Sequence, residues 1–164
     1  MKHNIAIGGL DGTAAFYLSS KIEAGNIRKE KPNTIGSVTV TARSLDSFIR
    51  EIGASDVALL KVDIEGAEIE MFQRATAEAI RRCKQINVEF HDQIRYPTTS
   101  AEEGELVRKK LEDLGFKGFD LGRKGFNWLF INHSSGVPGP VLLYLSLRSR
   151  FRNVMGESVT RSMV

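Results

Sequence analysis

The sequence has few of the features that mark a secreted or membrane-spanning protein. Cys83 is the only cysteine, so no internal disulfide can form, which favours a reducing, cytoplasmic setting. No stretch approaches the ~20 apolar residues of a membrane span, and residues 1–4 do not open a signal peptide. Because Cys83 lies at helical spacing from Phe72, Thr76 and Ile80, we expect it in the core rather than as a nucleophile.

The chain also has little excess charge. Its net charge of +3 lies in residues 148–164, where four arginines stand against one acid, leaving nineteen basic and nineteen acidic residues elsewhere. A nucleic-acid-binding domain usually carries a basic face, so the near-neutral body argues against a nucleic-acid partner.

The 164 residues suit one α/β domain, because strand-like and helix-like segments alternate along them. We expect a mostly parallel sheet that ends in a C-terminal antiparallel hairpin. The expected strands are 4–8, 13–19, 37–41, 57–63, 86–90, 116–121 and 128–132, and we expect 13–19 and 37–41 to pair as a ribbon. Three helices are expected: one from an N-cap at Ser44 to Ile52, one over Ala67–Cys83, and one from a capping box of Ser100 and Glu103 to about Leu114.

Two carboxylates follow the most apolar strand. Val57–Val62 is almost wholly apolar, and Asp63 and Glu65 come directly after it. Ligands of open α/β sheets bind outside the carboxyl ends of the strands, so these acids are well placed for chemistry. The alternative is that they only cap the next helix. Lys61, inside the apolar run, is expected either to extend its ammonium from the strand into solvent or to pair with an acid of the cluster, and we favour such a structural role over catalysis.

More polar side chains end the next strand. Segments 57–63 and 86–90 flank one predicted helix, so they form a βαβ unit and bring Glu89, His91 and Asp92 to the edge that holds Asp63. His91 is a candidate general base, oriented by Glu89 or Asp63. The alternative is a loop histidine that is satisfied by Asp92 or by backbone.

Three sequence blocks resemble one enzyme family. They are SLDSFI, LLKVDIEGAEIEMF and INVEFHD, in this order, and the resemblance runs from about Asn4 to His133. This pattern is similar to the FkbM-type family of S-adenosylmethionine-dependent methyltransferases. The resemblance implies a Rossmann-like class I methyltransferase fold and O-methylation of a hydroxyl on a sugar or other small molecule. We therefore expect Asp63, Glu89 and His91 to be catalytic, and Asp63 and Glu65 to contact S-adenosylmethionine.

The glycines near the start do not form a typical cofactor turn. Gly8, Gly9 and Gly12 give G-G-x-x-G, and the following TAAFYLSS alternates like a strand instead of opening a helix. We interpret residues 10–13 as a hairpin turn. The sequence thus predicts an N-terminally truncated domain that lacks the cofactor-binding part and binds S-adenosylmethionine weakly when alone.

Two further functions remain open. Asp63, Glu65, Glu89 and His91 form an oxygen and imidazole set that suits a divalent-metal-dependent hydrolase. The missing glycine turn suits a non-catalytic remnant. We divide the chain into a partial methyltransferase domain, residues 1–133, and a linker with a basic tail, residues 134–164. An exposed sheet edge or this tail is expected to allow self-association.

Overall fold

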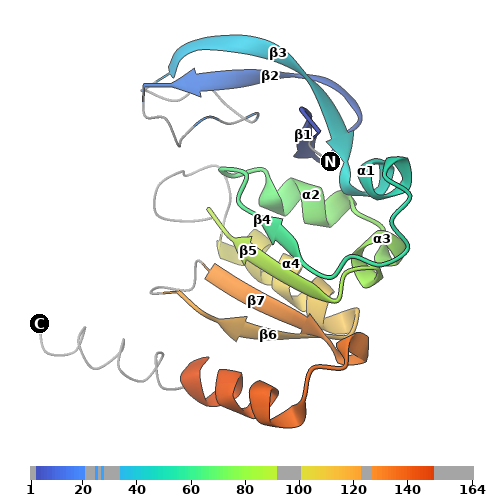
Figure 1. Ribbon diagram of the computed structural model, residues 1–164. Coiled ribbons are helices and arrows are strands. Elements are labelled where there is room, and N and C mark those ends of the chain that lie inside the picture. The colour runs from blue at the N-terminus through green and yellow to red at the C-terminus, as the bar shows by residue number, and fades with distance from the viewer. Residues whose placement is uncertain are drawn as a thin grey trace, which may run out of the picture.

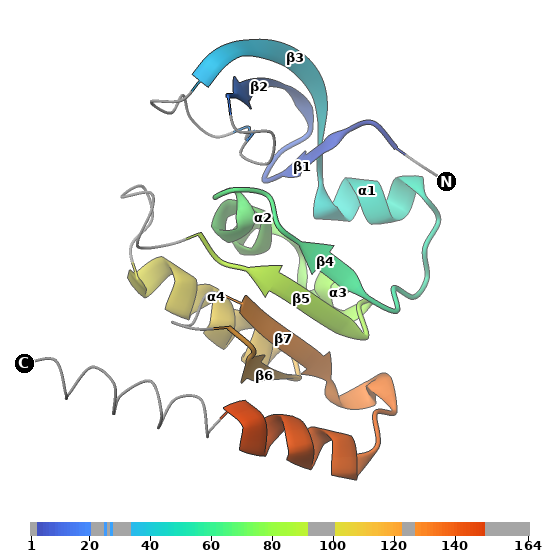
Figure 2. The same ribbon diagram turned by 60° about the vertical axis from the view of Figure 1, so that its left-hand side comes forward.

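The chain is an α/β protein with two mixed sheets (Figures 1 and 2). The computed structural model describes residues 3–20, 25, 27, 34–91, 101–122 and 127–149. Its labelled elements are β1 (Ala6–Gly8), β2 (Gly12–Ser19), β3 (Thr34–Ser44), α1 (Leu45–Glu51), β4 (Leu60–Val62), α2 (Glu68–Arg74), α3 (Ala77–Arg81), β5 (Gln85–Glu89), α4 (Ala101–Asp113), β6 (Phe116–Asp120), β7 (Asn127–Asn132) and η1 (His133–Ser135). Residues 139–149 are also helical.

The first sheet has the order β1-β3-β2. The antiparallel ribbon of β2 and β3 confirms the pairing predicted for the N-terminal strands. The predicted hairpin turn at residues 10–13 is wrong, because β1 and β2 both pair with β3, on opposite sides of Ala42. The Asp11 carboxylate helps to fix the segment between β1 and β2, since it accepts hydrogen bonds from Ser44 N at 2.7 Å and from Ser47 Oγ at 2.6 Å, at the start of α1.

The second sheet has the order β4-β5-β7-β6. β4 and β5 pair in parallel, which confirms the predicted βαβ unit, and the antiparallel β6–β7 pair confirms the C-terminal hairpin. The prediction of a mostly parallel sheet is wrong. β7 returns from β6 and inserts next to β5, so two of the three strand pairings described in this sheet are antiparallel.

The crossover between β4 and β5 contains two helices. We expected one helix over Ala67–Cys83, and this prediction is wrong. Ala75 is extended, with φ −60° and ψ 136°, and Thr76 caps α3 by accepting a hydrogen bond from Ala79 N. Asp46 on α1 accepts from both the backbone N and the hydroxyl of Thr76. The break thus comes from a tertiary contact that the local periodicity does not reveal.

The core lies mainly between the second sheet and its helices. Ile86, Val88 and Phe130 are fully buried there, and Leu111 of α4 packs in the same cluster. Cys83 is also fully buried, and burial raises the pKa of its thiol to about 11. The expected core position of Cys83 is therefore confirmed. Among the described residues, no helix has the length and apolar character needed to cross a bilayer.

The side chain of Lys110 links α4 to the C-terminal end of α2 by hydrogen bonds. Its ammonium donates hydrogen bonds to the carbonyl oxygens of Phe72 at 2.8 Å, Gln73 at 3.0 Å and Ala75 at 2.8 Å. The last carbonyls of a helix have no partner inside the helix, and a cation complements the negative end of the helix dipole. Lys110 therefore provides the C-terminal cap that the interrupted crossover requires.

We expect Lys110→Met to lower the free energy of unfolding by about 1–3 kcal/mol, because charge-assisted hydrogen bonds to three carbonyls are lost while the aliphatic stem remains. Urea denaturation followed by circular dichroism measures this change. Lys109→Met, at the exposed neighbouring position, is the matched control and is expected to be neutral. Equal midpoints for the two variants would show that the contacts with α2 contribute nothing.

Candidate functional site

A tight turn joins β4 to α2 and presents acidic side chains. Asp63 follows the last residue of β4, as predicted, and the chain then turns through Glu65 and Gly66, whose φ angles are +55° and +107°. A non-glycine residue in the left-handed region is uncommon, so this turn is held by specific contacts. The N-cap of α2 is Ala67 and has no side-chain hydrogen bond, so neither Asp63 nor Glu65 is the N-cap.

Glu68 provides the contacts that hold the turn. Its side chain is fully buried, and its carboxylate accepts hydrogen bonds from Ile64 N at 3.1 Å and from Gly66 N at 3.0 Å. A buried carboxylate is costly unless it is fully hydrogen-bonded, so the turn and Glu68 depend on one another. The same carboxylate also reaches the neighbouring strand.

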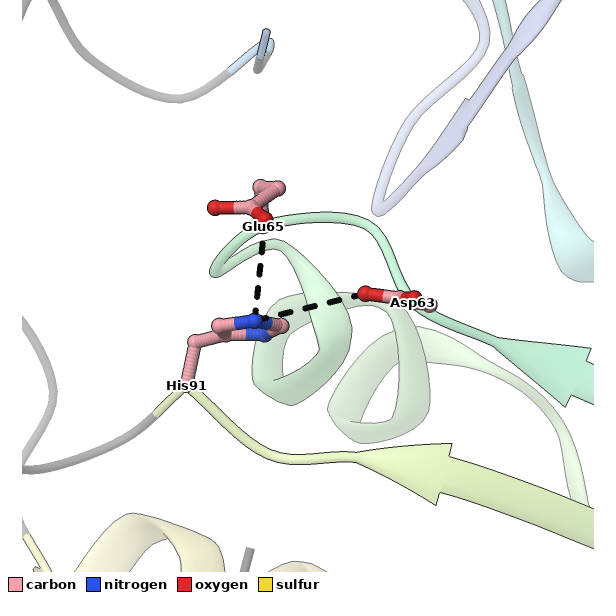
Figure 3. A group of neighbouring side chains, drawn as sticks. All are labelled: Asp63, Glu65 and His91. Carbon is pink, nitrogen blue, oxygen red and sulfur yellow. Dashed lines mark ion pairs between the residues drawn. The ribbon is translucent and has the colours of Figure 1, made fainter. Parts of the chain in front are cut away.

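His91 follows β5 and lies against Glu68. Its Nδ1 is 2.9 Å from Glu68 Oε1, and because a carboxylate only accepts, Nδ1 donates this bond. The other ring nitrogen, Nε2, faces the remaining acids and lies 3.8 Å from Glu65 Oε1 and 4.0 Å from both Asp63 Oδ1 and Glu89 Oε1. Figure 3 shows Asp63 and Glu65 approaching the ring from the turn after β4.

The structure thus brings together four of the predicted site residues: Asp63, Glu65, Glu89 and His91. Asp92 lies outside the described residues. The predicted orientation of His91 by Glu89 or Asp63 is wrong, since Glu68 makes the close contact instead.

Lys61 has the ionic partner that the sequence predicted. Its ammonium lies 3.3 Å from Asp63 Oδ2, but the side chain is 65% exposed. The pair is therefore a surface contact rather than a buried one, and it contributes little to stability.

Sequence reasoning missed Glu68, although the sequence contains a signal. Glu68, Met71, Phe72 and Ala75 are spaced as one face of a helix, and all four are buried. An acid on an otherwise apolar helical stripe predicts a buried, hydrogen-bonded carboxylate.

A cavity of about 680 Å³ opens in front of these residues. One side carries the acidic turn and His91, and the other side is apolar, formed by the first sheet and its neighbouring segments. Residues of the apolar side are Ile5, Ala6, Ile7, Phe16, Gly25 and Ile27. The cavity therefore has a negatively charged wall facing a hydrophobic one, which suits a ligand with both polar and apolar parts.

The surroundings of His91 act on its pKa in opposite directions. Burial lowers the pKa, but the hydrogen bond with Glu68 and the attraction of Glu68, Glu65 and Glu89 raise it more, so the net shift is upward from 6.5. The imidazole is therefore a stronger base than usual when neutral, and it is protonated over a wider pH range.

Asp63, Glu65 and His91 also offer oxygen and nitrogen atoms that lie within 4.8 Å of one another. Carboxylate oxygens with imidazole nitrogen are donors that divalent cations accept. The same atoms can equally hold a hydroxyl group or a positively charged organic group by hydrogen bonds and charge.

Comparison with known families gives one match. The family model described as the methyltransferase FkbM domain matches residues 1–117, which include β1 to β5, α4 and the whole acidic turn. No curated protein and no solved structure matches the chain.

We expect NMR titration of the His91 ring protons to give a pKa above 6.5. Glu68→Gln should bring the pKa down, because it removes both the negative charge and the carboxylate acceptor next to Nδ1. Glu70→Gln, two residues along α2, is the control and should leave the pKa unchanged. A pKa at or below 6.5 in the unaltered protein would show that burial outweighs the carboxylates.

Proposed function

Because the chain belongs to the family of FkbM methyltransferase domains, we propose that it transfers a methyl group from S-adenosylmethionine to a hydroxyl group of a small molecule, such as a sugar. The family supports methyl transfer in general, and the choice of a hydroxyl acceptor is our proposal. The observation that supports it best is the meeting of His91 Nε2 with Asp63, Glu65 and Glu89 at the wall of one cavity. A Rossmann-like class I fold, which the family suggests, remains a prediction for this chain.

The acidic wall fits the charge of the proposed cofactor. S-adenosylmethionine carries a positive sulfonium, an ammonium and ribose hydroxyls, and it supplies a methyl group to an attacking oxygen. Asp63 and Glu65 offer carboxylate oxygens to such groups from the turn after β4. Gly8, Gly9 and Gly12 offer the cofactor fewer backbone donors, because β2 rather than the start of a helix follows β1. Weak cofactor binding by this chain therefore stays a prediction.

His91 is the proposed proton acceptor. An acceptor hydroxyl must lose its proton as its oxygen attacks, and Nε2 is the ring nitrogen that faces the cavity, since Nδ1 is bound to Glu68. Glu68 acts through His91 and is a positioning residue. Asp63 and Glu89 lie close enough to His91 to hold the acceptor hydroxyl near Nε2.

The alternative of a divalent-metal-dependent hydrolase uses the same residues. Their donor atoms suit a cation, but the family match supports methyl transfer instead. Production of S-adenosylhomocysteine together with a methylated acceptor, from a panel of sugars and small alcohols, tests the proposed reaction directly.

We expect Asp63→Asn to lower methyl transfer by about 100-fold or more while leaving the fold intact, because a half-exposed carboxylate is replaced by an amide of the same shape. The rate of S-adenosylhomocysteine formation and the far-UV circular dichroism spectrum measure the two effects. Asp56→Asn, at an exposed position before β4, is the control. Turnover like that of the unaltered protein would remove Asp63 from the site.

We expect kcat/KM to rise with pH as His91 loses its proton, with a midpoint above 6.5. The sign follows from the upward shift, because only the neutral ring accepts a proton. His91→Ala should lower the rate by about 10²–10⁴-fold and abolish this rise. A rate within a few-fold of the original and an unchanged pH profile would instead assign His91 a structural role.

A further inference from the structure

The last described segment of the chain is a helix with one side packed on the domain and the other side exposed. Residues 139–149 are helical and lie beside the second sheet, next to the β6 edge (Figure 1). They fall beyond the residues that the family model matches, so the helix belongs to this chain rather than to the family match. One side rests on the domain: Leu142 and Leu145 are half-buried, and Ser149 Oγ accepts a hydrogen bond from Asp120 N at 3.2 Å.

The opposite side of this helix is apolar and exposed. Leu143 is 62% exposed, Tyr144 59% and Leu147 49%, and these positions follow the i, i+1, i+4 spacing of one helical face. Apolar residues on the inner side of a surface helix are usual, but a row of them on the outer side is not. A contiguous exposed apolar face marks an interaction surface.

Positive charge gathers at the same end of the chain. Arg148 is exposed next to Leu147, and the sequence continues with Arg150, Arg152 and Arg161 against a single acid, Glu157. The rest of the chain is neutral in sum. The apolar face and the net positive charge therefore occur in the same part of the sequence.

This coincidence discriminates between two possible occupants of the face. A second copy of the chain would present the same apolar face with another Arg148, and residues 139–149 contain no acid to pair with it. A bilayer with anionic headgroups receives the apolar side chains below its surface and attracts the arginines at it. Tyrosine, with an apolar ring and a polar hydroxyl, is also suited to the membrane–water boundary.

We propose that the 139–149 helix docks the protein onto anionic membrane surfaces. The helix lies flat in the interface, with Leu143, Tyr144 and Leu147 toward the acyl chains and Arg148 at the headgroups. The apolar run Val141–Leu147 is much shorter than the ~20 apolar residues of a membrane span, and arginines follow it in the sequence, so the binding is peripheral and reversible. This inference does not depend on the proposed methyltransferase activity.

Co-sedimentation of the full chain with lipid vesicles tests the proposal. We expect binding to vesicles of phosphatidylcholine with about a third phosphatidylglycerol, and binding at least about tenfold weaker to phosphatidylcholine alone. Binding should weaken at high salt, because the charge component is screened.

Variants test whether vesicle binding depends on this helical face or on exposed apolar residues in general. Leu143→Gln with Leu147→Gln should lower vesicle affinity about tenfold or more. Leu59→Gln with Leu106→Gln removes two equally exposed leucines elsewhere and is the matched control, which should bind as the unaltered protein does. Arg148→Glu should weaken binding to anionic vesicles several-fold, and it keeps the test valid if the double variant fails to fold.

Three results would overturn the proposal. They are equal binding to neutral and anionic vesicles, equal losses in the two double variants, and a dimer in light scattering that the Leu143 and Leu147 changes abolish. The last result would identify a second copy of the chain as the occupant.

Discussion

The arrangement of the site depends on one buried carboxylate. Glu68 accepts hydrogen bonds from the backbone of the turn after β4 and from the ring of His91 after β5. It thus fixes the ends of the neighbouring parallel strands β4 and β5 to the first turn of α2, the first helix of the crossover between them. The acids at the rim, Asp63 and Glu65, are left to face the cavity because the inward position is taken by Glu68. A buried charge costs free energy, and here three hydrogen-bond donors offset that cost.

The sequence predicted the parts of the site that follow from strand order. Val57–Val62 is mostly apolar, Ile86–Phe90 alternates apolar and polar residues, and the two segments flank a helical pattern. Their parallel pairing and the meeting of Asp63 with His91 therefore follow from the geometry of a βαβ unit. The burial of Glu68 could have been predicted from its position on an apolar helical stripe. The apolar wall of the cavity could not be predicted, because it comes from β1, β2 and their neighbouring segments, which are distant in sequence from the acids.

Other features of the fold depend on contacts that local patterns do not contain. The periodicity of residues 67–83 runs on through Thr76, but Asp46, thirty residues away, binds the backbone N and hydroxyl of Thr76 and favours a new helix start there. The apolar run within β7 likewise predicts a strand, but not that the strand lies between β5 and β6. Tertiary hydrogen bonds thus determine the helix break, and the pairing between strands determines the place of β7 in the sheet.

Gly9, the residue that follows β1, has a consequence for the contact between the first sheet and α2. A Cβ atom at this position would lie 2.7 Å from Cγ of Glu70 on α2, which is closer than real Cβ contacts. The first sheet can therefore rest directly on the helix that carries Glu68. A larger residue at position 9 would require the side chains of Glu70 and Arg74, which form an ion pair on α2, to move aside. The absence of a side chain at this one position thus lets the backbone after β1 and this ion pair lie against one another.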